Sequence, residues 1–182
     1  MTTATHSHPG APAPPLCTET LLHQLRSRDG LQRMKAREAL IRIGTPCIHG
    51  IIGLLAHDEM RARWEACKVL YSLRVPETAV PLAQLLMDEE MDVRWVAAEA
   101  LIELDRHALR PVLLAIEEHF DSSVLREAAH HVLASLHEKG LLEREEQEVL
   151  RALRVTELPS KAAFTANNVL EHLRSDPTPD RL

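Results

Sequence analysis

The feature that most constrains the fold is a short motif that recurs along the chain. The segment Asp92–Leu104 reads DVRWVAAEALIEL. Its pattern is an arginine, a small residue three positions later, an apolar pair six and seven positions later, and an aliphatic residue ten positions later. The same frame begins at four arginines, Arg33, Arg63, Arg94 and Arg126. Self-similarity at a period of about 30 residues predicts a solenoid of stacked helical hairpins.

Composition favours helices and limits the classes of partner. The hydrophobic content is 45% but aromatic residues make up only 3%, so alanine and leucine supply most of the core. The net charge of −6 argues against a protein that coats nucleic acid or an anionic membrane, because both require a cationic face. No apolar run approaches the ~20 residues that span a bilayer. We therefore expect neither a nucleic-acid nor a membrane partner.

Cysteine usage points to a reducing compartment. Cys17, Cys47 and Cys67 are odd in number and have no CxxC spacing, which is atypical of a disulfide framework or a structural zinc site. The N-terminus has no basic segment followed by an apolar run, so no secretory signal is expected. A cytoplasmic location follows as an expectation.

The motif divides the chain into three parts. Residues 1–15 hold four prolines and little that can be buried, so a disordered tail is expected there, and the polar residues 175–182 are expected to form another. Residues 16–174 form one repeat domain of five predicted hairpins. In the last hairpin, residues 162–173 repeat the small-then-aliphatic spacing without the arginine, which predicts a second helix with Phe164 in the position of the two tryptophans.

These residues resemble a known repeat family. Asp92-Val93-Arg94, followed by Ala97, Ala100, Leu101 and Leu104, is similar to HEAT-type repeats, specifically the short bacterial type named after the phycobilisome (PBS)-lyase HEAT-like repeat. The resemblance covers residues from about 16 to 174. It implies an all-α fold, a right-handed α-α superhelix (solenoid) of about five HEAT-like hairpins. It says little about function, because the family includes scaffolds, lyase-related proteins and a few enzymes.

An aspartate precedes each motif arginine by four to six residues. We expect these eight residues to form a structural ladder, in which the aspartates cap helices and the arginines bind the carboxylates or the neighbouring turn. The alternative is a row of arginines that binds phosphate; because every arginine has its own aspartate, the structural role is preferred. The aspartates are Asp29, Asp58, Asp88 and Asp121.

A helical wheel separates two apolar faces on the motif helices. With Val93 at zero, Ala97, Leu101 and Leu104 fall on one side, whereas Trp95 and Ile102 fall on the opposite side. In a hairpin solenoid the second helices line the concave surface, so the opposite side is expected to face a groove. The predicted groove residues are Met34, Ile41, Trp64, Tyr71, Trp95 and Ile102, with Glu38, Lys68, Glu99 and His131 as a polar rim. The alternative is that each tryptophan packs flat against the next repeat.

No residue pattern indicates catalysis or a cofactor. His130 and His137 share a face but lie two turns apart, and His131 points elsewhere, so a metal site is not expected. There is no nucleophile–base pair and no glycine-rich phosphate loop. The leading hypothesis is a non-catalytic protein-protein interaction module, or scaffold, that binds a peptide or protein surface in its groove. The alternatives are an accessory lyase or chaperone that holds a hydrophobic cofactor such as a bilin, and a nucleic-acid-processing protein.

Overall fold

A computed structural model describes residues 18–154 and 159–175. They form α-helices and short 3-10 helices, with no strand in these two ranges. The α-helices are α1 (Thr18–Gln24), α2 (Gly30–Ile43), α3 (Ile48–Leu55), α4 (Met60–Leu73), α5 (Ala79–Gln84), α6 (Met91–Ile102), α7 (Leu109–Glu118), α8 (Ser123–Glu138), α9 (Arg144–Ala152) and α10 (Pro159–Ser175). The 3-10 helices are η1 (Thr45–Cys47), η2 (Pro76–Thr78), η3 (Leu85–Met87) and η4 (Asp105–Ala108). The predicted tail 1–15 lies outside the described residues, as does the tail 175–182 except for Ser175.

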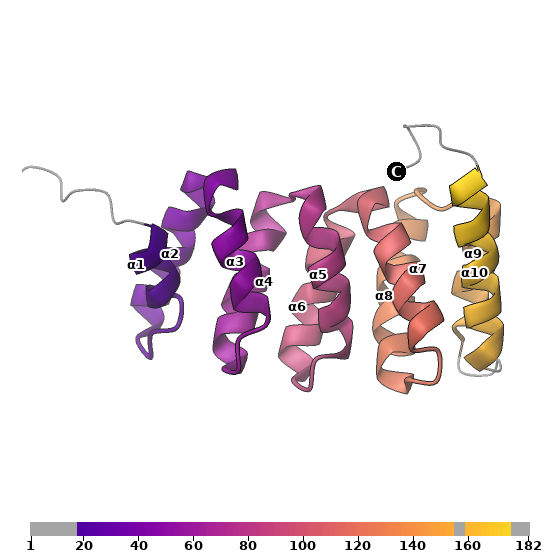
Figure 1. Ribbon diagram of the computed structural model, residues 1–182, viewed down its shortest axis with the longest axis horizontal. Helices are drawn as coiled ribbons and strands as arrows, with labels where there is room; N and C mark the ends of the chain where they lie inside the picture. The colour runs from indigo at the N-terminus through magenta and orange to yellow at the C-terminus, as the bar shows by residue number, and fades with distance from the viewer. Residues whose placement is uncertain (1–17, 155–158, 176–182) are drawn as a thin grey trace, which may run out of the picture.

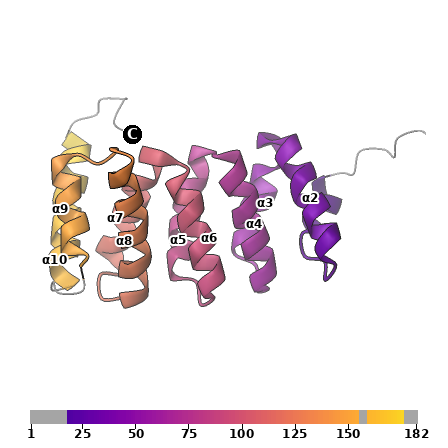
Figure 2. The ribbon, with the colours of Figure 1, turned by 180° about the vertical axis from the view of Figure 1, so that it is seen from behind.

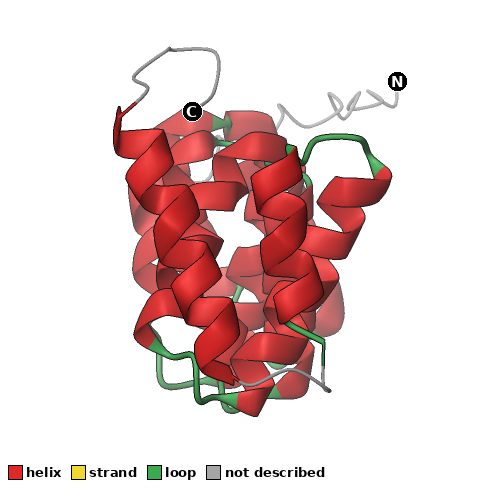
Figure 3. Ribbon diagram, turned by 90° about the vertical axis from the view of Figure 1, so that its right-hand side faces the viewer, coloured by secondary structure: helices red, strands yellow, loops and turns green. Residues whose placement is uncertain are grey.

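The helices stack in two rows, which confirms the predicted all-α solenoid. Helices α1, α3, α5 and α7 contact one another in turn and make the first row, which faces the viewer in Figure 1. Helices α2, α4, α6 and α8 make the second row, which faces the viewer in Figure 2. Figure 3 looks along the stack from its C-terminal end and shows the two rows side by side. Each hairpin therefore joins one helix of each row.

Small residues allow the second-row helices to approach closely. The alanine three positions after each motif arginine is completely buried in all four copies: Ala36, Ala66, Ala97 and Ala129. The leucine seven positions after each motif arginine is equally buried: Leu40, Leu70, Leu101 and Leu133. These leucines belong to one continuous core together with the aliphatic side chains of the first row. An alanine at the contact and a leucine beside it give the interlocking surface that close helix packing requires.

The last hairpin departs from the predicted order. Helix α10 packs against α7 and α9, so it extends the first row, and α9 follows α8 at the end of the second row. The prediction that residues 162–173 form a second-row helix is therefore wrong, and Phe164 lies on α10, outside the second-row face. Spacing alone does not reveal this, because a small-then-aliphatic stripe gives a helix one buried face without specifying which row will cover it.

Two local features position this reversed hairpin. The three earlier connections between hairpins pass through the 3-10 helices η1, η2 and η4, whereas the chain leaves α8 through Gly140, whose φ of +72° favours glycine. Arg106 of η4 then binds the start of α9: its guanidinium donates to both carboxylate oxygens of Glu146, at 2.9 and 3.1 Å, and to the carbonyl of Leu141 at 2.6 Å. Glu146 is 3% exposed, so its carboxylate is buried, whereas the side chain of Arg106 is 21% exposed.

We expect Arg106→Ala to lower the free energy of unfolding by about 3 kcal/mol, because removing one partner leaves a buried carboxylate without its cation. Urea denaturation followed by circular dichroism measures the change. The matched control is Arg110→Ala on the exposed side of α7, expected to shift stability by less than about 0.5 kcal/mol. Equal effects of the two substitutions would show that the Arg106–Glu146 pair does not hold the last hairpin.

Candidate functional site

The motif arginines bind the turn of their own hairpin through its backbone. Arg33 Nη1 donates to the carbonyls of Ser27 and Arg28, at 2.8 and 3.1 Å. The same pair of positions recurs one repeat later, where Arg63 Nη1 binds the carbonyls of His57 and Asp58, and again where Arg94 Nη1 binds those of Asp88 and Glu89. A guanidinium has enough donors to serve two carbonyls that the tight turn leaves without a backbone partner.

The predicted pairing of each arginine with its own aspartate is not what the first three repeats show. Asp29 accepts the backbone N–H of Leu31 at the start of α2, and Asp88 binds the arginine of the previous repeat. The side chain of Asp58 caps no helix, since α4 begins after Glu59 without a side-chain cap. Asp121 is exposed, and Ser122 caps α8 in its place. The turn carbonyls lie closer to the guanidinium and replace the aspartate as its acceptor.

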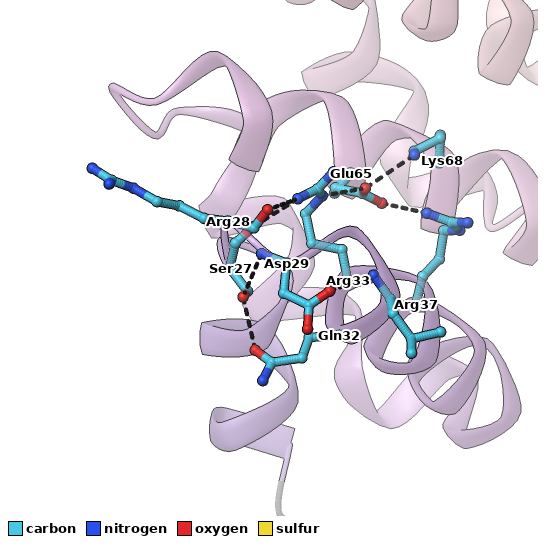
Figure 4. A network of polar contacts seen from close by, with 9 residues as sticks. Ser27, Arg28, Asp29, Gln32, Arg33, Arg37, Glu65 and Lys68 are labelled. Atoms are coloured by element: carbon cyan, nitrogen blue, oxygen red, sulfur yellow. Dashed lines mark hydrogen bonds and ion pairs between the residues drawn. The ribbon is translucent and has the colours of Figure 1, made fainter.

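A buried carboxylate links the first two repeats (Figure 4). Glu65 of α4 is 1% exposed and accepts from three cations: Arg33 at 3.2 Å, Arg37 at 2.6 Å and Lys68 at 3.1 Å. Burial lowers the pKa of Lys68, and its bond to Glu65 opposes that shift. Sequence reasoning missed Glu65 and Arg37, although a signal exists: in the third repeat the corresponding positions hold the small or apolar residues Val96 and Ala98.

The motif arginines differ in the acids that they reach in the next repeat. Arg63, which is 7% exposed, binds both oxygens of Asp88, at 2.7 and 2.8 Å, and this bond raises the pKa of Arg63 above its ordinary value. Arg94, by contrast, forms no ion pair with a carboxylate in the part of the chain that the structure describes. Its hydrogen bonds go to the two turn carbonyls of Asp88 and Glu89.

We expect Glu65→Ala to lower the free energy of unfolding by about 3 kcal/mol, because it leaves Arg33, Arg37 and Lys68 close together without their shared acceptor. The control is Glu38→Ala, an exposed acid on the adjacent helix, expected to change stability by less than about 0.5 kcal/mol. Chemical denaturation of the two variants measures the change in the free energy of unfolding for each. A small loss for Glu65→Ala would mean that the cations are already well solvated.

The predicted groove residues differ widely in exposure. Trp95 is 60% exposed, and Met34 and Tyr71 are also exposed, whereas Trp64 and Ile41 are half-buried. Ile102 is only 7% exposed and belongs to the core, so its assignment to an open surface is wrong. It lies in the last turn of α6, against which α8 packs, and Lys139 from the end of α8 donates to its carbonyl. A helical wheel gives the direction in which a side chain points from its own helix axis. It does not show whether a helix of the next repeat buries that side chain.

The two tryptophans have different surroundings. The ammonium of Lys68 lies over the ring of Trp64, 3.2 Å from its centroid, and covers that face. The ring of Trp95 stacks on His131 of the next repeat, with centroids 4.8 Å apart and an interplanar angle of 21°. His131 in turn lies 2.8 Å from Glu99, which fixes the imidazole. The rim residues Glu99 and His131 thus hold Trp95 in place, while the rim residue Glu38 is exposed.

Three furrows follow one another along the second row. The first, about 400 Å³, is lined by Met60 and Trp64 together with charged residues. The second, about 660 Å³, lies between α6 and α8 and is lined by Met91, Trp95 and Arg94. The third, about 580 Å³, lies between α8 and the end of α9 and is lined by Ser123, Arg126, Glu127, His130, Leu153 and Arg154. Burial, followed by the charges of Arg154 and His131, lowers the pKa of His130.

The described residues, 18–154 and 159–175, hold neither a metal-binding cluster nor a single helix that could span a membrane. No three His, Cys, Asp or Glu side chains there lie close enough together to bind a metal ion. Within the same ranges, no single helix is long and apolar enough to cross a membrane; only α2 taken together with Thr45–Leu55 meets the length and composition, and that pair is bent by 116°.

Fluorescence quenching distinguishes the two tryptophans. We expect Trp64→Phe, which retains only the exposed Trp95, to be quenched more strongly by acrylamide than Trp95→Phe, which retains the indole beneath Lys68. The measurement is the Stern–Volmer constant of each folded variant. Equal constants, or the reverse order, would contradict the difference in exposure.

The comparison with protein-family models matches two overlapping stretches, residues 18–102 and 48–134, to the family described as HEAT repeats. Together these stretches cover more than half of the chain. The chain belongs to the HEAT-repeat family. The family resemblance is thereby confirmed at the level of HEAT repeats, whereas the phycobilisome-lyase type stays a prediction from the residue pattern. The comparison with curated proteins finds no match.

Two solved structures are similar to this HEAT-repeat chain, and both are described as crystal structures of engineered proteins. One aligns with a TM-score of 0.47 and 19% identity over 87% of this chain and 79% of the other. The second aligns with a TM-score of 0.40 and 20% identity over 87% and 81%. The fold assignment rests on the stacked hairpins and on the family match.

Proposed function

We propose that this HEAT-repeat chain is a non-catalytic interaction module that binds a peptide or protein surface on its second-row face. The observation that carries the proposal is the exposure of Trp95. An indole that is 60% exposed beside a furrow of about 660 Å³ leaves a large apolar surface in water, and tryptophan is enriched among the residues that dominate binding energy.

The surroundings of Trp95 also suit a binding role. The ring is held by stacking on His131, which Glu99 orients, so little side-chain entropy is lost when a partner covers it. Met91, one turn earlier on the same helix, is 70% exposed and enlarges the apolar surface. Met34, Tyr71 and the partly covered Trp64 extend it along the second row toward the N-terminus. Such an arrangement has an apolar centre and a charged border, as protein interfaces do.

We expect Trp95→Ala to abolish retention of a partner that the wild type captures from a lysate of the source cells. Once the partner is isolated, its affinity should fall at least about thirtyfold, the loss typical of a residue at the centre of an interface. Affinity capture with the immobilised protein, followed by titration of the isolated partner, measures both effects.

Phe164→Ala is the matched control for this experiment. Phe164 is an aromatic of similar exposure, 68%, but it lies on α10 in the first row. We expect this variant to retain the partner, and both variants must unfold cooperatively. Loss of the same partner from Phe164→Ala alone would place the binding surface on the first row and overturn the proposal.

A further inference from the structure

The surroundings of Trp64 show how this chain covers an aromatic ring on its second row. Trp64 directly follows a motif arginine, with Arg61 three residues before it and Lys68 four residues after it. Residues at these spacings share one face of a helix, one turn away on either side. The ammonium of Lys68 lies 3.2 Å from the ring centroid and donates to the carboxylate of Glu65, 3.1 Å away. The ring is thus covered by a cation that an acid holds in place.

Trp95 occupies the equivalent position one repeat later, with the opposite charges beside it. Asp92 lies three residues before Trp95 and Glu99 four residues after it. His131 stacks on one face of the ring, and Trp95 is 60% exposed, so the other face lies in water. Within residues 18–154 and 159–175, no lysine or arginine lies over this ring. Helix α6 therefore keeps the aromatic ring but has two acids where α4 has two cations.

The acids around Trp95 are available to a ligand. Asp92 is exposed and forms no ion pair in the part of the chain that the structure describes. Glu99 Oε1 lies 2.8 Å from His131, whereas its Oε2 has no partner there, and its side chain is 33% exposed. The exposed Glu127 lines the same furrow, as does Arg94, whose Nη1 is bound to the turn carbonyls before α6. Three acids near the ring against one arginine favour a positively charged ligand.

We infer that the partner places a lysine or arginine side chain over the open face of Trp95, where Glu99 accepts a hydrogen bond from it. The partner's cation takes the place that Lys68 takes over Trp64, and an apolar residue beside it covers Met91, which is 70% exposed. This inference rests on the proposed interaction role and names the chemistry of the partner's contact residue. A purely apolar partner would take the nearby carboxylates out of water without a cation, which costs free energy.

A displayed library of random peptides tests the inference. The library is selected on the immobilised full chain and depleted on Trp95→Ala, so that the recovered peptides require the indole. We expect these peptides to be enriched in a lysine or arginine next to an apolar residue. A recovered peptide is labelled with fluorescein, and its binding is followed by anisotropy. Replacing its lysine by norleucine, or its arginine by citrulline, removes the charge and should lower the affinity about threefold to thirtyfold.

Protein variants locate the cation on the surface. On Trp95→Leu, which keeps an apolar side chain without a π face, the loss caused by removing the peptide charge should shrink at least about threefold. Glu99→Gln keeps an acceptor for His131 and should weaken binding about twofold to fivefold, and Glu99→Lys should weaken it more. Glu38→Lys is the matched control, because Glu38 occupies the same motif position beside Met34. It should leave the affinity unchanged, and every variant is first shown to unfold cooperatively.

Several results would overturn the inference. Recovered peptides that depend on Trp95 but carry no cation defeat the ligand chemistry and leave the interaction role intact. A library that yields no peptide dependent on Trp95 also defeats it, while the capture experiment still decides the interaction role. Equal losses from Glu38→Lys and Glu99→Lys would show that the peptide responds to the overall charge and not to this site. Sedimentation of the free chain as a dimer that Glu99→Lys dissociates would identify a second copy as the occupant.

Discussion

Close contact between consecutive second-row helices is the constraint on which the structure depends. No hairpin here can bury its apolar stripe alone, so each needs the next one to cover it. The fully buried alanines Ala36, Ala66, Ala97 and Ala129 set how near the helices come, and the leucines beside them fill the space to the first row. Because this contact repeats at nearly constant spacing, every outward-facing position also repeats. The row of furrows is a consequence of how the core is packed.

The motif arginines serve the same stacking through polar contacts. Each of the first three binds two turn carbonyls of its own hairpin, which fixes the loop from which the second helix starts. Two of them then reach an acid in the next repeat, Arg33 to Glu65 and Arg63 to Asp88. Within the described residues, Arg94 makes no such second contact. The break coincides with the part of the second row where Trp95 is exposed, the surface on which we place the partner.

The C-terminal hairpin differs from the four hairpins before it in the order of its two helices. At the C-terminal end the hairpin is reversed, and Arg106 together with Glu146 holds α9 next to α8. As a result, Arg154, at the end of α9, faces His130 and Arg126 of α8 and completes the third furrow. With the order that the spacing suggests, α10 would stand there, and its exposed side chain would be Phe164. The reversal thus places Arg154, rather than an aromatic side chain, at this end of the second row.

The sequence by itself determined the period, the class of fold, the family and the direction in which each motif helix buries its alanine and leucine. It could do so because these properties depend on one helix at a time, through the 3.6-residue periodicity. Tertiary structure decided the rest. Whether Ile102 is open or covered, which row α10 joins, and that Arg33 and Arg37 reach Glu65 all depend on side chains from helices roughly thirty or more residues apart in sequence. A helical wheel describes directions around one axis, whereas exposure and pairing depend on the distance to the next axis, and only the packed chain sets that distance.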